Sequence, residues 1–149
     1  MTQLQDTIWA LNKDQISIKE FINWINDHIQ RILYQHDSLK YHIHHEGDLS
    51  IELSPTATIN LYRIVQEALN NIVKHADAEL IYLDIQVGSS AIEIKVVDDG
   101  IGLDNPEGKE VHYGLQNMRA RMKELGGTLL IQSSKGTEPS IIMNMPWSS

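Results

Sequence analysis

Nine consecutive residues carry the strongest structural signal in this chain, Glu67-Ala68-Leu69-Asn70-Asn71-Ile72-Val73-Lys74-His75. They lie inside residues 56–76, where apolar side chains recur at helical spacing from Ile59 to Ala76. Ser54 and Pro55 come just before this run, and a capping serine followed by proline in the first turn marks a helix start. The stretch therefore predicts a helix over residues 56–76.

Four polar side chains of that helix are expected to share one face. Glu67, Asn71, Lys74 and His75 fall at positions i, i+4, i+7 and i+8. A carboxylate can order or deprotonate a nucleophile, and an amide oxygen is a hard ligand that suits magnesium. Lysine and histidine can meet phosphate oxygens. The face predicts a site for a metal-bound polyphosphate.

The rest of the chain predicts an α+β fold around this helix. The expected helices are residues 4–11, 17–35, 56–76 and 113–125, and the expected strands are residues 41–53 with a loop at Gly47-Asp48, then 80–87, 91–97, 128–132 and 140–145. Ser17 and Glu20 have capping-box spacing at the start of the second helix. This order predicts helices on one face of a mixed sheet.

Two glycine motifs flank a polar loop at residues 98–111. Asp98-Asp99-Gly100-Ile101-Gly102 follows a strand directly, and a carboxylate there can accept a hydrogen bond from an amine such as that of adenine. Asp-Gly also marks ordinary turns. His112-Tyr113-Gly114-Leu115 opens the next helix, where glycine lets backbone N–H groups approach a phosphate. Near the end of the chain, the Thr137 hydroxyl of Gly136-Thr137 could touch a base.

Composition excludes several classes of protein. The 149 residues suffice for one domain with a core, and the net charge of -8 argues against a general nucleic-acid or anionic-membrane surface. The absence of cysteine excludes disulfides, thiolate zinc sites and cysteine nucleophiles. Walker-type, dinucleotide-type and protein-kinase motifs are missing from the sequence, so a nucleotide site here belongs to none of those types.

In this order the motifs resemble the ATP-binding catalytic domain of bacterial sensor histidine kinases, whose fold is shared with gyrase, Hsp90 and MutL. Glu67-x-x-x-Asn71-x-x-Lys74-His75 is similar to the family's N box, and Asp98-x-Gly100-x-Gly102 is similar to its first glycine box. His112-Tyr113-Gly114-Leu115-Gln116-Asn117-Met118-Arg119-x-Arg121 is similar to the second box, in the form typical of the nitrate-sensor/DesK-like subfamily. Gly136-Thr137 resembles the terminal Gly-Thr turn, so the resemblance covers residues 54–146.

The resemblance implies a fold and a role for each residue. The fold is a Bergerat-type ATP-binding domain, a two-layer α/β sandwich of about three helices on a mixed sheet of about five strands. Glu67 would position or activate the attacking group, Asn71 would coordinate magnesium, and Lys74 and His75 would approach phosphates. Asp98 would accept from the adenine amine, with Thr137 nearby. Gly100, Gly102 and Gly114 would allow close backbone contact with ATP, beside His112 and Leu115, and residues 103–112 would form a lid.

The resemblance also implies how the domain would be used. Residues 1–16 would hold the end of a dimerisation helix and a linker, and residues 17–149 the catalytic domain. The domain would bind ATP and Mg²⁺ and donate the γ-phosphoryl group to a histidine on the dimerisation hairpin of a parent kinase, from which a response regulator would take it. No Leu-His-Asp-type phosphoacceptor box occurs in the sequence, so we expect a fragment that does not autophosphorylate by itself. We expect it to be cytoplasmic and monomeric, without nucleic-acid or direct membrane contact, although the parent kinase can be membrane-anchored.

Three other functions stay open at this stage. A stand-alone serine/threonine kinase of the anti-sigma type is favoured by the missing histidine box and disfavoured by the Met-Arg-x-Arg form of the second glycine box. A non-catalytic nucleotide-binding interaction domain is the second. A gyrase- or MutL-type ATPase is the third, and it would need a transducer domain for which no room remains after Met145.

Overall fold

The computed structural model describes residues 14–76, 78–100, 109–132 and 140–147. The helices are α2 (Ile18–Gln35), α3 (Pro55–Asn71), the π-helical segment η1 (Ile72–Ala76) and α4 (Lys109–Glu124). The strands are β1 (Ile16–Ser17), β2 (Lys40–Glu46), β3 (Glu52–Leu53), β4 (Leu80–Val87), β5 (Ala91–Asp98), β6 (Thr128–Gln132) and β7 (Ser140–Pro146). The predicted helix at residues 4–11 lies outside the described residues.

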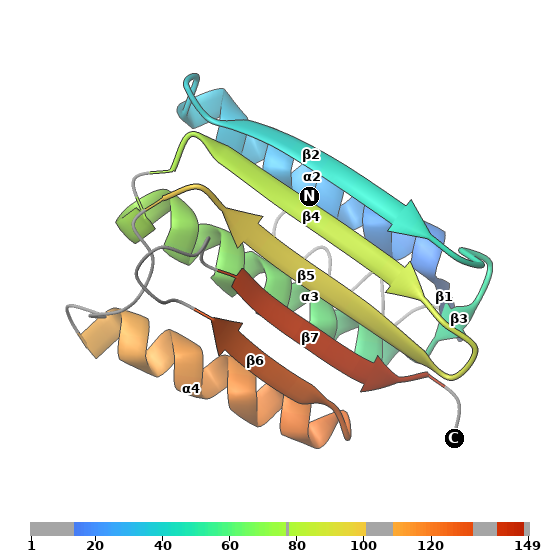
Figure 1. The fold of residues 1–149 in the computed structure, drawn as a ribbon. Helices are drawn as coiled ribbons and strands as arrows, with labels where there is room; N and C mark the ends of the chain where they lie inside the picture. The colour runs from blue at the N-terminus through green and yellow to red at the C-terminus, as the bar shows by residue number, and fades with distance from the viewer. Residues whose placement is uncertain (1–13, 77, 101–108, 133–139, 148–149) are drawn as a thin grey trace.

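A five-stranded sheet forms one layer of the fold. Its strand order is β2-β4-β5-β7-β6, and β2 runs parallel to β4 while the other neighbours are antiparallel. Helices α2, α3 and α4 lie side by side on one face of this sheet (Figure 1). The predicted fold class is confirmed: three helices cover a mixed five-stranded sheet in a two-layer α/β sandwich.

Alternation along the two central strands explains why the sheet has one buried face. In β4, Ile81, Leu83 and Ile85 are buried, and the residues between them are more exposed. In β5, Ile92, Ile94 and Val96 alternate in the same way, and Leu83 lies opposite Val96 in the antiparallel register. Because each fully buried side chain of this size contributes roughly 1.5–3 kcal/mol, these two strands fix which face meets the helices.

Helices α2 and α3 begin at the caps that the sequence predicts. Ser17 Oγ accepts a hydrogen bond from the Glu20 backbone N–H at 3.1 Å, and Ser54 Oγ accepts one from the Ala57 N–H at 3.1 Å. The two-residue strand β1 pairs with β3, with Ile16 opposite Leu53, and Ile16 is fully buried. The packed domain therefore includes Ile16.

The predicted strand at residues 41–53 is interrupted over a longer stretch than expected. β2 ends at Glu46, and only Glu52 and Leu53 return to strand geometry. Gly47 has a φ of +105°, and a Cβ there would lie 2.8 Å from Val87 Cβ. The chain therefore needs glycine at the point where it leaves the sheet.

The helix predicted over residues 56–76 changes type before it ends. Its α-helical part stops at Asn71, and residues 72–76 form the π-helical turn η1. A π turn holds more residues than an α turn. The assumption of α spacing was therefore wrong beyond Asn71, and Lys74 and His75 do not follow Glu67 and Asn71 at the predicted angles.

The last helix begins earlier than predicted. We expected a loop up to residue 111 and a helix from residue 113, but α4 starts at Lys109, so Gly114 lies inside the helix. The C-terminal end agrees with the sequence: Gly126 has a φ of +72°, its N–H donates to Lys123 O at 3.0 Å, and the Gly127 N–H donates to Met122 O at 2.9 Å. These are the two hydrogen bonds of a Schellman cap.

Candidate functional site

Helices α3 and α4 meet in an antiparallel register that two contacts define. Gly114 lies against the side chain of Glu67, where an added Cβ would be 3.1 Å from Glu67 Cδ and still closer to Oε1. Seven residues further along α4, Arg121 Nη1 donates to Oδ1 of Asn60, seven residues before Glu67, at 3.1 Å. Met118 lies between these contacts and is almost fully buried. The glycine thus leaves room for the Glu67 side chain between the two helices, and it lies within α4 and not at its start.

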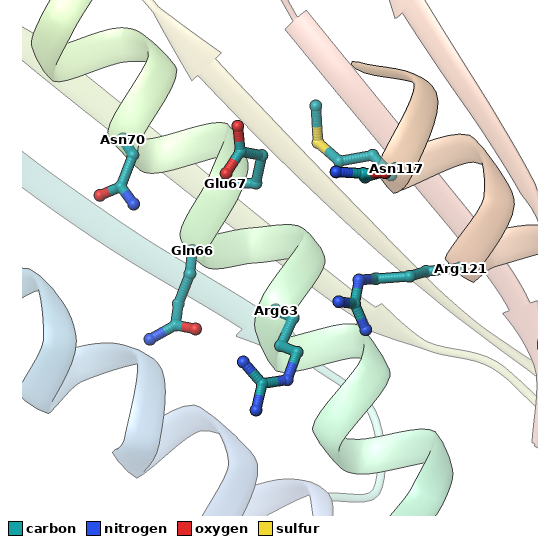
Figure 2. Close-up of a pocket in the computed structure, with 7 residues that line it drawn as sticks. Arg63, Gln66, Glu67, Asn70, Asn117 and Arg121 are labelled. Atoms are coloured by element: carbon teal, nitrogen blue, oxygen red, sulfur yellow. The ribbon is translucent and has the colours of Figure 1, made fainter. Parts of the chain in front are cut away.

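An open groove lies between these helices (Figure 2). It has a volume of about 130 Å³ and is lined by Arg63, Gln66, Glu67, Asn70, Asn117, Met118 and Arg121. Six of these seven side chains are polar or charged. Glu67 is the predicted site residue that lines it, and it is partly exposed there. The groove gives the Glu67 carboxylate access to a molecule that approaches from outside the helical layer.

Sequence reasoning assigned no role to Arg63, Gln66 or Asn117. Arg63, Glu67 and Asn70 stand at i, i+4 and i+7, so extending the polar stripe of α3 backwards from Glu67 would have found the arginine. Asn117 and Arg121 stand at i and i+4 on α4 and could have been paired in the same way. Arginine side chains on helices are usually solvated, so the residue type alone did not indicate that Arg63 belongs to a site.

Asn71 is buried next to this groove and does not line it. Its side chain is only 5% exposed, and its Nδ2 has no hydrogen-bond partner among the described residues. A buried N–H donor without a partner costs free energy, and a ligand that accepts from Nδ2 would remove that cost. Lys74 lies on η1 and is exposed. The structure describes the backbone of His75, not its side chain.

The two carboxylates after β5 have different surroundings. Asp98 is buried on the same side of the strand as Val96, which faces the helices, and its Oδ1 accepts from the Gly100 N–H at 2.7 Å. Asp99 is exposed, and its Oδ1 accepts from the N–H groups of Leu80 at 3.0 Å and Glu79 at 2.9 Å. The hydrogen bond from the Leu80 N–H is the largest cause that lowers the pKa of Asp99; desolvation opposes it, and the bond from the Glu79 N–H lowers the pKa further by a smaller amount. Asp99 ties the end of β5 to the start of β4, and Asp98 is the carboxylate placed between sheet and helices.

The remaining predicted site residues divide into three groups. Gly100 follows Asp98 and is held by it, and the Leu115 side chain is buried in the core beneath α4. Only the backbone of His112 is described, in the first turns of α4. Gly102, Thr137 and residues 103–108 of the expected lid lie outside the described residues. The structure therefore brings Glu67, Asn71 and Gly114 together at α3 and α4, and puts Asp98 at the end of β5.

The described residues were also considered as a metal site and as membrane spans. Within residues 14–76, 78–100, 109–132 and 140–147, no group of three or more histidine, aspartate or glutamate side chains is arranged to hold a metal ion. His44 Nε2 lies 3.2 Å from Glu46 Oε1, and His42 stacks on Tyr82 at 5.4 Å. The helices in this part of the chain are also too short or too polar to cross a membrane.

The sequence is similar to a known family and to several curated proteins. A family model described as histidine kinase-, DNA gyrase B-, and HSP90-like ATPase matches residues 56–148. The chain is 40% identical over 89 residues to the signal transduction histidine-protein kinase/phosphatase UhpB of Salmonella typhimurium, which covers 60% of this chain and 18% of that protein. It is 33% identical over 112 residues to the sensor histidine kinase ComP of Bacillus subtilis, covering 70% of this chain and 14% of that protein. The chain thus spans less than a fifth of the length of these two curated relatives.

Solved structures share the fold at low sequence identity. The histidine kinase domain of the Erythrobacter litoralis EL346 blue-light activated histidine kinase superposes with a TM-score of 0.73 at 18% identity, covering 97% of this chain and 79% of that one. The ATP binding domain of PrrB from Mycobacterium tuberculosis superposes with a TM-score of 0.68 at 22% identity, covering 92% of this chain and all of that one.

Proposed function

The chain belongs to the histidine kinase-, DNA gyrase B- and HSP90-like ATPase family, and from this we propose that it binds ATP with Mg²⁺ and donates the γ-phosphoryl group to a histidine on a dimerisation hairpin. It is an ATPase domain of the type found in sensor histidine kinases. A response regulator would receive the phosphoryl group from that histidine. The hairpin and the response regulator are proposed partners, because the chain spans only part of the length of its relatives.

The buried Asn71 amide is the observation that supports this function best. It lies one helical turn after Glu67, and its Nδ2 has no partner among the described residues. The unpartnered Nδ2 is a donor that suits a phosphate oxygen, while the amide oxygen of Asn71 and the carboxylate of Glu67 are ligands of the kind that magnesium prefers, so the chemistry of these residues fits an ion bound to a polyphosphate. Asn71 would hold Mg²⁺, which when bound neutralises charge on the β- and γ-phosphate oxygens.

Asp98 supports an adenine subsite at the other end of the site. Its carboxyl group is buried on the helix-facing side of β5, and a hydrogen bond from the Gly100 N–H fixes it. A buried carboxylate held in this way can accept from the adenine amine with little loss of side-chain entropy. Lys74 and His75 on η1 would then meet the phosphates.

Phosphoryl transfer to histidine gives Glu67 a role beside the attacking imidazole. A nitrogen of the acceptor imidazole forms a bond to the γ-phosphorus, the bond from that phosphorus to the bridging oxygen breaks, and ADP leaves. The attacking nitrogen uses its lone pair, and Glu67 would order the imidazole and take the proton from the other ring nitrogen. Positioning and neutralisation of charge supply most of the remaining catalysis.

Calorimetry with a non-hydrolysable ATP analogue, with and without Mg²⁺, tests the proposal. We expect binding that strengthens when Mg²⁺ is added. Well-folded protein that binds no nucleotide under either condition would overturn it. A second assay mixes the chain, ATP and Mg²⁺ with a phosphoacceptor hairpin from a sensor kinase: acid-labile label on histidine is expected, and acid-stable label would favour the serine/threonine kinase alternative.

A further inference from the structure

We propose that the groove between α3 and α4 docks the helix that carries the phosphoacceptor histidine, and that Arg63 and Arg121 bind a carboxylate of that helix one turn from the histidine. The inference rests on the proposed function and adds the recognition chemistry of its protein substrate. It concerns the groove defined by Arg63, Gln66, Glu67, Asn70, Asn117, Met118 and Arg121.

The two ends of the groove differ in chemistry. Glu67 and Asn117 lie at one end, and Arg63 and Arg121 lie at the other, with each pair drawn from both helices (Figure 2). The first end contains the carboxylate proposed to accept a proton. The second end concentrates two guanidinium groups in a protein whose net charge is -8. An incoming molecule therefore meets a proton acceptor and a cationic end in one groove.

The spacing of these ends matches one turn of a helix. Arg63 precedes Glu67 by four residues on α3, and Asn117 precedes Arg121 by four on α4. Four residues span about 6 Å along a helix axis, and residues four apart lie on one face. A helix aligned with the groove can present a histidine to Glu67 and, four residues away, an aspartate or glutamate to the arginines.

Arg121 is held in the orientation that such recognition needs. Its Nη1 donates to Asn60 Oδ1 at 3.1 Å, which anchors the guanidinium to α3. A guanidinium has five N–H donors, so this bond leaves others for a carboxylate, and paired donors bind carboxylates in a bidentate manner. An anchored side chain loses less entropy when it binds.

The size of the groove fits side chains better than a whole helix. A volume of about 130 Å³ admits an imidazole and a carboxylate, while the helix backbone would rest on the rims of α3 and α4. The amides of Gln66, Asn70 and Asn117 can donate to or accept from polar side chains beside the histidine. Asn71 and Asp98, proposed to hold the nucleotide, are not among the residues that line the groove.

Peptide binding to the nucleotide-loaded chain tests the inference. The probes are stapled alanine-rich helices of about 20 residues. One peptide has a glutamate four positions before its histidine, and the other has it four positions after. Each has a matched peptide with glutamine in place of glutamate. We expect one glutamate peptide to bind about tenfold more tightly than its glutamine match in fluorescence anisotropy at low salt. Arg63→Gln and Arg121→Gln should each remove most of that preference.

Arg119→Gln is the matched control, because Arg119 is an exposed arginine of the same helix that does not line the groove. It should keep the full preference. A charge-reversal variant gives a result that loss of folding cannot produce. The Arg63→Glu protein should bind a peptide with lysine in place of glutamate more tightly than it binds the glutamate peptide. Equal binding of the glutamate and glutamine peptides, absence of peptide binding, or equal effects of Arg119→Gln and Arg121→Gln would each overturn the inference. Calorimetry on the same samples separates the two proposals, since nucleotide binding without peptide discrimination overturns only the docking groove.

Discussion

Gly114 on α4 stands so close to Glu67 on α3 that a single methyl group at position 114 would displace the Glu67 carboxylate. The nearest atoms it would meet are Oε1, Cδ and Cγ of Glu67, all in a flexible side chain. The collision can therefore be relieved by rotation of Glu67 without movement of the backbone. This separates the effect of a substitution on stability from its effect on chemistry.

Gly114→Ala is expected to leave the free energy of unfolding within about 1 kcal/mol of the native value, because alanine favours the helix by about that amount and offsets the steric cost. Transfer of the phosphoryl group to a hairpin histidine should fall by about a hundredfold, as for a displaced general base. Urea unfolding and a timed phosphotransfer assay measure the two quantities. Glu67→Gln is the reference for loss of the carboxylate, and an active Gly114→Ala protein would argue against a base at this position.

Asp98→Ala is expected to weaken binding of an ATP analogue by about 1–3 kcal/mol, the range for a buried hydrogen bond that loses its partner. Isothermal calorimetry measures the change. Asp99→Asn is the matched control, because Asp99 is the neighbouring carboxylate and is engaged with the backbone of residues 79 and 80. Equal losses in the two variants would mean that the turn, and not the adenine contact, is responsible.

Asn71→Ala is expected to remove the dependence of nucleotide binding on Mg²⁺, so that affinities with and without the ion become equal. The reason is that Asn71 supplies the amide proposed to hold the ion. A magnesium titration on the variant measures this. Asn70→Ala, one residue earlier and lining the groove, should keep the dependence. A variant at position 71 that still responds fully to magnesium would remove Asn71 from the metal site.

Asp99 is expected to make a pH-dependent contribution to stability. Backbone hydrogen bonds lower its pKa in the folded state below the usual value of 3.8, so the charged form is favoured by folding. The contribution is present above that ordinary pKa and is lost as the pH falls through the lower, folded-state value. The difference in unfolding free energy between the native chain and Asp99→Asn should thus be constant near neutral pH and shrink below about pH 4. Urea titrations at several pH values measure it, with the exposed Asp37→Asn as control; a difference that grows on acidification would contradict the assignment.

Local signals in the sequence located most of the fold. Ser17 and Ser54 cap the helices that they were predicted to cap, and Gly126, which follows the predicted helix end at residue 125, has a positive φ after α4. These features were predictable because each depends on a few neighbouring residues. The alternation of β4 and β5 likewise follows from one buried face.

The features that were missed depend on tertiary contacts. The π turn at residues 72–76 leaves no mark in hydrophobic spacing, and the position of Gly114 was misread because glycine marks helix ends as well as close helix contacts. The groove needs α3 and α4 in one particular register, which no local pattern specifies. Arg63 and Asn117 therefore became candidates only when the two helices were seen together.

The one-sided arrangement of the fold also has a practical use. All the proposed substrate contacts that the structure describes lie on or under the helical layer, so the opposite face of the sheet can carry a reporter without touching them (Figure 1). Asn144 on β7 is exposed, and its buried neighbours Met143 and Met145 point the other way. Because the chain contains no cysteine, Asn144→Cys would create a single thiol for a fluorophore or a surface tether. A chain attached in this way would present its groove to solution, so that binding of nucleotide and of an acceptor helix could be followed on one immobilised molecule.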